Sequence, residues 1–418
     1  MASDSKHFLS GRKVIVCGAG LGGLTFVLSL LKFWDAAVPA PEVVIVDADG
    51  REESINRGLY DLQLNADTEE SALVGLGDLG LYDAVVAQAV TRNNPDSTMH
   101  VWDKSWKSLM TIKPKVMEGF STGGVRIRRT ALLALLIEAV EARTKITWRT
   151  SVQDAKRLPD GTLRVSLLDK NTGAASQEEC ALLVAADGDD STLRKIFRPK
   201  DVTKLTGHVG LGGQVDFGDK ASVPAPLTSD FGITVGGDGV ASAVVQLNND
   251  GKLLWSIFKE EKTPRAAYDN TDAAAFKALL DEARTSSKSI AEPLPSLIGK
   301  TKQETSFARA VRERDAFGHD APELRGIIFI GDANRLVSVY MNNGGGLAIR
   351  DGISLAQELV GQKSLEAATA AYDKAALARS TASIKSGRKT MDTAHLSGWK
   401  WSVAKTALSA GGFLTGKN

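Results

Sequence analysis

The residues most suited to chemistry are glycines near the start of the chain, in the run Gly18-Ala19-Gly20-Leu21-Gly22-Gly23. In a G-x-G-x-x-G pattern the first glycine permits a tight turn, and the second lets a pyrophosphate approach the backbone. The third allows a helix to pack closely on a strand, and the phosphate lies at the positive N-terminus of that helix. The pattern predicts a dinucleotide site made by Gly18, Ala19, Gly20, Gly22 and Gly23. A structural glycine-rich turn is the alternative.

A carboxylate is expected to hold the ribose of that dinucleotide, at the end of the next strand. Asp47 follows the apolar, β-branched run at 43–46 and is the favoured candidate, with Asp49 as its competitor. The distance from the glycines to Asp47 is longer than usual, and the segment at 34–41, which contains Pro39 and Pro41, can absorb the excess.

Three further groups of residues follow in order along the chain. Arg129-Thr-Ala-Leu132 fits R-x-x-L, and the segment at 187–194 fits D-G-x-x-S-x-x-R, from Asp187 to Arg194. A G-D pair at 331–332 precedes a glycine run that continues to Asp351. In this order the four motifs resemble those of the class A flavoprotein monooxygenases. The segment at 58–62 is similar to one that runs beside the flavin in tetracycline-destructase-like members.

The resemblance implies FAD as the cofactor and assigns a role to each motif. Asp332 would accept the ribityl or ribose hydroxyls, and the helix that begins near Gly344 and Gly345 would point N–H groups at the flavin carbonyl O2. Arg129 would stabilise the anionic cofactor; Arg126 and Arg128 are rivals for that role.

Asp187 and Arg194 would form an ion pair that positions the pyrophosphate or the nicotinamide side, a surface salt bridge being the alternative. The chain carries no second G-x-G-x-x-G for NADH or NADPH, which matches a family in which the nicotinamide cofactor binds transiently.

The resemblance also implies the reaction. NAD(P)H reduces FAD, O2 forms a flavin C4a-(hydro)peroxide, and one oxygen passes to a small, largely apolar molecule by hydroxylation or epoxidation. A flavin oxidase or dehydrogenase without oxygen insertion, and a flavin-binding protein without redox activity, are the alternative interpretations.

The loop before the glycine run departs from the family pattern. Family members usually have a proline and then a glycine where this chain has Val339 and Asn342. Proline would fix φ, and glycine would let the backbone approach the flavin, whereas an Asn side chain can donate and accept hydrogen bonds. We therefore expect Asn342 or Asn343 to bond the peroxide or the substrate as a catalytic group. Neutral drift, or loss of oxygen transfer, would explain the same departure.

The elements that must position these residues alternate between strands and helices. Short apolar runs at 14–16, 43–46, 182–186 and 326–330 predict buried strands of a parallel sheet, and helical patterns lie at 22–33, 129–143 and 347–359. A hairpin-like region is broken by turns at 159–161 and 171–173. The fold class predicted is α/β: a Rossmann-like FAD-binding domain with an inserted antiparallel β-sheet substrate domain and a C-terminal helical segment.

The expected FAD-binding domain comprises residues 10–200 and 309–362, with parts of 60–125 on the substrate side. Residues 201–308, rich in glycine, valine and alternating patterns, are the expected substrate domain, with a polar helix at 272–284. Residues 363–418 are the C-terminal helices, and 399–413 is expected to be a docking helix. The alternative for each candidate substrate contact is a place in the core of the sheet. The candidates are Gln214, Asp216, Phe231, Gln246 and Trp255.

Composition excludes several other classes of protein. The formal net charge of +1 gives no argument for nucleic acid as a partner, and no stretch has the apolar length of a membrane span. Two distant cysteines and a polar start predict a cytoplasmic protein, as a monomer or homodimer, whose partners are a small-molecule substrate and O2. No metal-ligand spacing occurs, and the G-x-S-x-G at 119–123 lacks the strand and helix of a hydrolase nucleophile.

Overall fold

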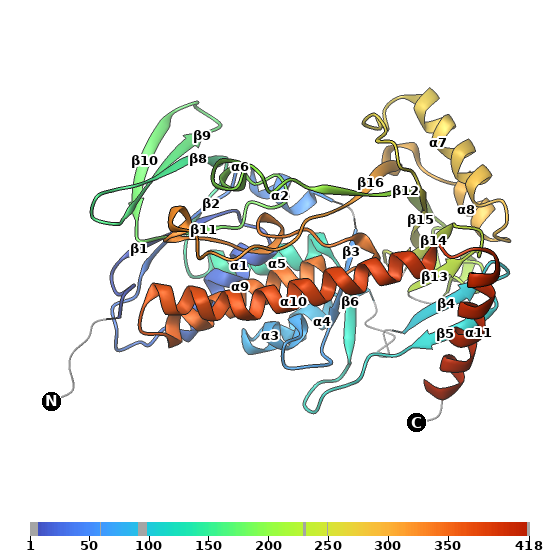
Figure 1. Cartoon of the computed structure of the whole chain (residues 1–418), viewed down its shortest axis with the longest axis horizontal. Helices are drawn as coiled ribbons and strands as arrows, with labels where there is room; N and C mark the ends of the chain where they lie inside the picture. Colours follow the sequence, from blue (N-terminus) through green and yellow to red (C-terminus); the bar gives the residue numbers. More distant parts are fainter. Residues whose placement is uncertain (1–6, 59, 91–97, 229–230, 249, 416–418) are drawn as a thin grey trace.

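Residues 7–58, 60–90, 98–228, 231–248 and 250–415 are described by the structure, which is a computed structural model. They form a parallel sheet with helices, a small antiparallel sheet, a larger seven-stranded sheet and two long C-terminal helices, so the predicted α/β fold is confirmed. Figure 1 shows the two sheet regions at opposite ends of the molecule, joined by the long helix α10 (Leu365–Ala394).

The parallel sheet is the nucleotide-binding type of sheet that the apolar runs predicted. Its order is β17-β11-β1-β2-β7, and every neighbouring pair is parallel. The strands are β1 (Lys13–Cys17), β2 (Glu42–Val46), β7 (Ile146–Thr147), β11 (Leu182–Ala185) and β17 (Ile327–Phe329). Because both faces are covered, the strands need apolar side chains on both sides, which explains the unbroken apolar runs.

Helices cover one face of this sheet and an antiparallel sheet covers the other. The helical face has α1 (Leu21–Phe33), α5 (Arg129–Glu141) and α9 (Gly344–Gly361), whose apolar residues share one core with the strands. The second core contains residues of β8 (Thr150–Arg157), β9 (Leu163–Asp169) and β10 (Ala175–Cys180). The helix α9 begins three residues before the predicted start at 347, because the glycine run itself is helical.

Glycines allow α1 and α9 to pack in backbone contact. A Cβ on Gly352 of α9 would lie 2.4 Å from the carbonyl oxygen of Gly22 and 2.6 Å from Oγ1 of Thr25. A Cβ on Gly22 would lie 3.1 Å from the carbonyl oxygen of Ala348. Oγ1 of Thr25 also donates to the carbonyl of Ile349 across the helix pair, at 3.3 Å. Larger side chains at these places would therefore separate the two helices.

The seven-stranded sheet forms the other half of the molecule. Its order is β16-β12-β15-β14-β13-β4-β5, antiparallel except for the pair β13 and β4. The strands are β4 (Met99–Asp103), β5 (Ser108–Ile112), β12 (Lys204–Asp216), β13 (Phe231–Val235), β14 (Ala241–Gln246), β15 (Lys252–Glu260) and β16 (Phe307–Glu313). The boundary expected between 308 and 309 therefore falls inside β16.

Helices cover both faces of the larger sheet in part. Apolar residues of α7 (Ala273–Ser286) and α8 (Leu294–Gly299) pack on one face. On the opposite face, α11 (Gly398–Thr415) packs over β4 and β5 through Trp401, and Lys405 pairs with Asp103 at 2.8 Å. The docking helix predicted at 399–413 therefore corresponds to α11, which packs on the seven-stranded sheet. No helix among the described residues is long and apolar enough to cross a membrane.

The remaining elements lie between the two sheets or along their edges. β3 (Asp61–Asn65) and β6 (Gly124–Arg128) form a two-stranded antiparallel ribbon, which Figure 1 shows between the two halves. The short helices are α2 (Arg51–Asn56), α3 (Ala72–Asp78), α4 (Tyr82–Ala87) and α6 (Thr192–Phe197). Single 3₁₀ turns occur at Lys220–Ser222, Gln303–Thr305, Pro322–Leu324, Gly331–Ala333 and Val339–Met341.

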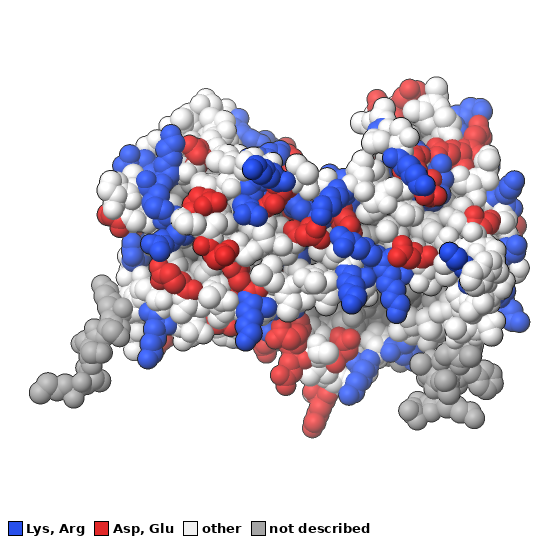
Figure 2. Space-filling view, in the orientation of Figure 1, with Lys and Arg blue, Asp and Glu red and all other residues white. Residues whose placement is uncertain are grey.

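Charge is mixed over the molecular surface. Figure 2 shows basic and acidic side chains interspersed over the viewed face, including the base of the notch between the two lobes. This distribution agrees with the formal net charge of +1, since neither sign dominates.

The contact between α1 and α9 gives a prediction for stability. Gly352→Ala should lower the free energy of unfolding by about 1–3 kcal/mol, because the new methyl group overlaps backbone atoms of α1. Gly361→Ala, at the end of the same helix, is the matched control, since nothing lies within 4 Å of an added Cβ there. Chemical unfolding of both variants measures the difference; equal stability of the two would contradict the close contact.

Candidate functional site

The loop between β1 and α1 has the backbone geometry that the glycine pattern requires. Gly18 has a φ of +108°, and a Cβ there would lie 2.4 Å from the carbonyl oxygen of Ala186. A Cβ on Gly23 would lie 2.1 Å from the carbonyl oxygen of Gly18, so this glycine lets the helix pack on the loop. A Cβ on Gly20 would lie 4.0 Å from the carbonyl oxygen of Ala186, so the space beside this glycine can admit a ligand.

Asp47, at the end of β2, faces this loop. Its carboxylate accepts the Ala19 N–H at 2.7 Å and the Asp49 N–H at 2.9 Å. Burial raises the pKa of Asp47, while the Ala19 hydrogen bond and the cations Arg57, Lys170 and Arg129 oppose the rise. The competitor Asp49 instead pairs its side chain with Arg57. Of the two acids, Asp47 is the one joined to the glycine loop.

The three arginines around β6 have different surroundings. Nη1 of Arg129 donates to the carbonyls of Ser54, at 3.1 Å, and Arg57, at 2.6 Å, at the end of α2. Its charge reaches Asp47, since it lowers the pKa of that acid. Arg126 is buried and forms an ion pair with Asp61, whereas no ion pair of Arg128 occurs among the described residues. Arg129 is thus the arginine on the dinucleotide side.

The predicted ion pair between Asp187 and Arg194 is not formed. Oδ2 of Asp187 accepts the Thr192 N–H at 2.9 Å and so caps α6. The buried Arg194 turns the other way and donates to the carbonyls of Asp189, at 2.7 Å, and Ala333, at 3.5 Å. The ion pair does not form because the long Arg194 side chain extends away from Asp187 toward the G-D loop. Burial raises the pKa of Asp187, opposed by hydrogen bonds that include those from Ser191 and Thr192.

A second arginine, unnoticed in the sequence, connects the same two motifs. Arg314 follows β16 and is buried; its Nη1 bonds Asp189 Oδ1 at 3.2 Å, and its Nη2 donates to the Asp332 carbonyl. Arg312 also pairs with Asp189, at 2.6 Å. Asp189 is therefore a structural acid between the motifs. Its substitution would disturb both motifs, so Asp189 is unsuitable as a control for a substitution of Asp332.

Asp332 lies just after β17 with its carboxylate unbonded. None of the described residues donates a hydrogen bond to this carboxylate, whereas its carbonyl is held by Arg314. Burial raises the pKa of Asp332, and Arg335 opposes the rise. The loop itself is fixed by the buried Asp351 of α9, which accepts the Gly331 N–H at 3.0 Å and pairs with Arg335. An acid at a strand end without a protein partner fits a cofactor hydroxyl.

The loop before α9 separates the two asparagines. Asn342 has a φ of +47°, in the left-handed region, and its side chain has no hydrogen bond within the described part of the chain. Asn343 is turned toward α10, where its amide exchanges hydrogen bonds of 3.0 and 3.1 Å with Ser383. The expectation of a catalytic Asn343 is therefore corrected: its side chain holds the loop onto a helix. Gly344 and Gly345 begin α9, the helix whose N-terminus is expected to face the flavin.

One face of the seven-stranded sheet is turned toward this loop. Paired residues form a row across four strands on that face, in the order Gln214, Leu254, Val245 and Phe231. Two rows further along the same face is Phe258, whose ring centroid lies 5.0 Å from that of Tyr340 in the loop. Two of the predicted substrate residues, Gln214 and Phe231, lie on this face.

Two other predicted substrate residues, Trp255 and Gln246, lie on the opposite face. Trp255 is fully buried under α7 and α8, and its Nε1 donates to Thr301 at 2.8 Å. Gln246 lies on the same covered face, where its amide donates to the Leu227 carbonyl at 3.1 Å. Asp216 points to the same side of β12 as Gln214, but it lies at the end of the strand, where it caps the turn at Gly218 and lies near Lys302 at 3.5 Å. Side chains alternate along a strand, so neighbours in sequence face opposite sides.

The ribbon of β3 and β6 brings a buried ion pair to the face of the sheet that bears Phe231. Nε of Arg126 donates to Asp61 at 2.5 Å, and both side chains are almost fully buried. The Arg126 guanidinium lies 4.2 Å from the ring centroid of Phe231. Burial raises the pKa of Asp61, and the charge of Arg126 opposes that rise. The motif at 58–62 contained Asp61, but nothing local identified its partner.

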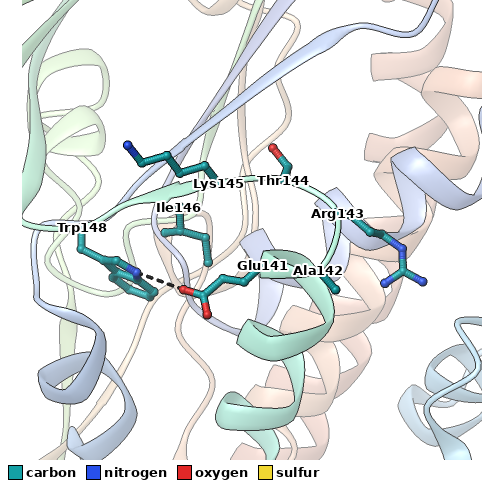
Figure 3. Close-up of a pocket in the computed structure, with 7 residues that line it drawn as sticks. All are labelled: Glu141, Ala142, Arg143, Thr144, Lys145, Ile146 and Trp148. Atoms are coloured by element: carbon teal, nitrogen blue, oxygen red, sulfur yellow. Dashed lines mark hydrogen bonds between the residues drawn. The ribbon is translucent and has the colours of Figure 1, made fainter.

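Surface hollows elsewhere do not involve these residues. A hollow of about 460 Å³ lies at the end of α5. Figure 3 shows the residues that line it, among them Trp148, whose Nε1 donates to Glu141 at 3.3 Å. A second, more apolar hollow of about 540 Å³ lies around Trp34. Neither contains a predicted cofactor or substrate residue. Within the described residues no cluster of His, Cys, Asp or Glu could hold a metal ion.

The chain is similar to fungal monooxygenases over most of its length. It is 32% identical over 392 residues to the monooxygenase cfoF of Aspergillus candidus, covering 93% of each chain. It is 23% identical over 425 residues to the FAD-dependent monooxygenase adaC of Aspergillus niger, covering 93% of this chain and 94% of the relative. No protein-family model matches the sequence.

Solved structures share the fold. Klebsiella pneumoniae HpxO, complexed with FAD and uric acid, superposes with a TM-score of 0.76 at 18% identity, covering 97% of this chain and 94% of the other. The tetracycline destructase Tet(55) gives a TM-score of 0.68 at 17% identity, covering 97% and 96%. Fold and site together define a flavoprotein oxidoreductase. The chain belongs to the class A FAD-dependent monooxygenases, and its cofactor is FAD.

Asp332 provides a test of the cofactor site. Asp332→Ala should raise the dissociation constant of FAD about tenfold or more, since a cofactor hydroxyl loses its charged acceptor. Asp190→Ala is the matched control, because the Asp190 side chain is 93% exposed in the D-G motif and its ion pair is with Lys195, at 2.6 Å. FAD titration of the apoproteins measures both constants. Equal constants would remove the role assigned to Asp332.

Proposed function

We propose that this enzyme uses NADH or NADPH and O2 to hydroxylate or epoxidise a small, largely apolar molecule. One observation carries the proposal: the loop before α9 meets the seven-stranded sheet at the contact of Tyr340 with Phe258, on the face that bears Gln214 and Phe231. A substrate on that face would therefore lie beside the residues expected to hold the flavin. The relatives support oxygenation, since the similar chains are named monooxygenases.

The cofactor is proposed to extend from the glycine loop to the start of α9. The α1 N-terminus and the space beside Gly20 suit the pyrophosphate, Asp47 the adenosine ribose and Asp332 the ribityl hydroxyls. Bound FAD supplies electron transfer from the nicotinamide and the activation of O2. The full set of proposed cofactor residues is Gly18, Ala19, Gly20, Gly22, Gly23, Asp47, Arg129, Asp187, Asp332, Gly344 and Gly345.

The glycines at the start of α9 suit negative charge on the flavin. The first N–H groups of a helix have no partners within it, and the helix dipole adds positive potential at that end. α9 has 18 residues and begins at Gly344, without an acidic residue in its first turn. A Cβ on Gly345 would lie 2.7 Å from Leu62, so this turn also packs tightly against β3. The chain would thus hold the reduced cofactor by fixed N–H groups.

The face of the sheet that bears Phe231 suits an apolar, flat substrate. Leu254, Val245, Phe231 and Phe258 supply apolar contacts there, and such a surface excludes water from the reacting atoms. The Arg126–Asp61 pair beside Phe231 adds one buried polar group that can orient a substrate oxygen or nitrogen. Gln214 lies at the end of the same row as Phe231.

Asn342 is proposed as the residue that distinguishes this loop. A left-handed φ costs an asparagine little, so Asn342 can occupy the backbone place of a glycine. It then adds an amide where the family has no side chain. We propose that this amide hydrogen-bonds the substrate or the reacting oxygen beside the flavin.

The proposed reaction predicts incorporation of oxygen from O2. With ¹⁸O-labelled O2 and NADH or NADPH, a turnover substrate should stimulate nicotinamide oxidation and yield a product heavier by one labelled oxygen atom. Mass spectrometry measures the label in the product, and a peroxidase assay measures released hydrogen peroxide. Turnover that produces only hydrogen peroxide and unlabelled product would identify an oxidase and overturn the proposal.

Asn342→Gly should lower the coupling, meaning product formed per NAD(P)H consumed, by about three- to tenfold, the factor expected for one lost hydrogen bond. Glycine keeps the left-handed backbone, and adding Val339→Pro restores the family pattern. Asn171→Gly, in an exposed turn, is the matched control. Flavin reduction should be unchanged in all variants. Unchanged coupling in Asn342→Gly would indicate drift in the loop.

A further inference from the structure

Three parts of the chain meet at one aromatic cluster beside the proposed pocket. Tyr340 belongs to the flavin-side loop, Phe258 and His208 to neighbouring strands of the seven-stranded sheet, and His395 follows α10. Ring centroids lie 5.0 Å apart for Tyr340 and Phe258 and 4.4 Å apart for His208 and His395. None of these four residues belongs to a family motif named above.

Hydrogen bonds through His395 tie the loop to the sheet. Nδ1 of His395 lies 2.7 Å from the Gly239 carbonyl, in the turn between β13 and β14, and Nε2 lies 2.5 Å from Tyr340 Oη. A carbonyl only accepts, so Nδ1 carries the proton, and in a neutral ring Nε2 must accept. The Tyr340 hydroxyl therefore donates to His395.

The surroundings favour this neutral form of the ring. Burial, the largest effect, lowers the pKa of His395; the Gly239 hydrogen bond opposes it, the neighbouring His208 lowers the pKa further, and Glu260 and Asp392 raise it. A neutral ring at pH 7 keeps Nε2 available as the acceptor. The bond to Tyr340 thus belongs to the normal state of the protein.

We propose that His395 is a positioning residue through which the C-terminal helices close the pocket, by holding Tyr340 of the loop against Phe258. The ring of Tyr340 would shield the oxygen side of the flavin from water. Release of that ring would let reduced cofactor and O2 yield hydrogen peroxide instead of product. The inference rests on the proposed monooxygenase activity.

Two substitutions of His395 separate its two hydrogen bonds. His395→Gln places an acceptor near the Nε2 position and can still hold Tyr340, whereas His395→Asn reaches only the Nδ1 position and retains just the Gly239 bond. We expect His395→Asn to lower coupling about three- to tenfold, the factor for one lost hydrogen bond, and His395→Gln to restore most of it. Tyr340→Phe should match His395→Asn, and the double variant should show no further loss.

A second measurement needs neither substrate nor oxygen transfer. Iodide quenching of the fluorescence of bound FAD should be stronger in His395→Asn and Tyr340→Phe than in the wild type and His395→Gln. Asp392→Asn is the control, because this exposed acid lies in the last turn of α10 without bonding Tyr340. FAD content and melting temperature identify any variant that fails to fold.

The outcomes are distinct for the two proposals. If wild-type protein forms no labelled product, the proposed oxygenation fails, and quenching still decides the role of His395. Quenching and coupling of His395→Asn equal to those of the wild type would overturn the positioning role. So would equal defects in the Asn and Gln variants, since the bond to Tyr340 would then be irrelevant.

Discussion

The backbone contact between α1 and α9 is the constraint on which the cofactor site depends. Both helices begin at a proposed contact with the cofactor, so their N-termini must keep a fixed separation. Gly22 and Gly352 supply that separation, because neither leaves room for a side chain between the helices. Through α9, the same contact positions Asp351, which holds the G-D loop by the Gly331 N–H. Two motifs more than 300 residues apart in sequence thus share one rigid support.

Polar side chains then connect this support to the substrate half. Arg314 follows a strand of the seven-stranded sheet, yet it bonds Asp189 and the Asp332 carbonyl in the cofactor half. Removal of a buried arginine from such a network leaves unpaired acceptors, so each half stabilises the other. The bonds of Arg314 therefore help to fix the position of the seven-stranded sheet relative to the G-D loop.

The sequence predicted the strand ends well and the sheet faces poorly. Asp47, Asp332 and the glycine loop lie at the ends of buried parallel strands, a pattern that apolar runs reveal directly. Trp255 and Gln246 could not be placed, because strands with apolar residues on both faces do not reveal which side opens to the site. His395 and Arg314 act over long sequence distances, and no local spacing indicates their partners.

The parallel pairing of β13 with β4 has an evolutionary consequence. The seven-stranded sheet takes strands from before, within and after the central β-rich segment, because β4 and β5 come from residues 99–112 and β16 ends at Glu313. A graft of residues 201–308 alone between relatives would place strands of two different proteins side by side at both borders, in the pairs β12–β16 and β13–β4. Recombination that exchanges the whole sheet between relatives would therefore have to move three separate stretches of the chain together.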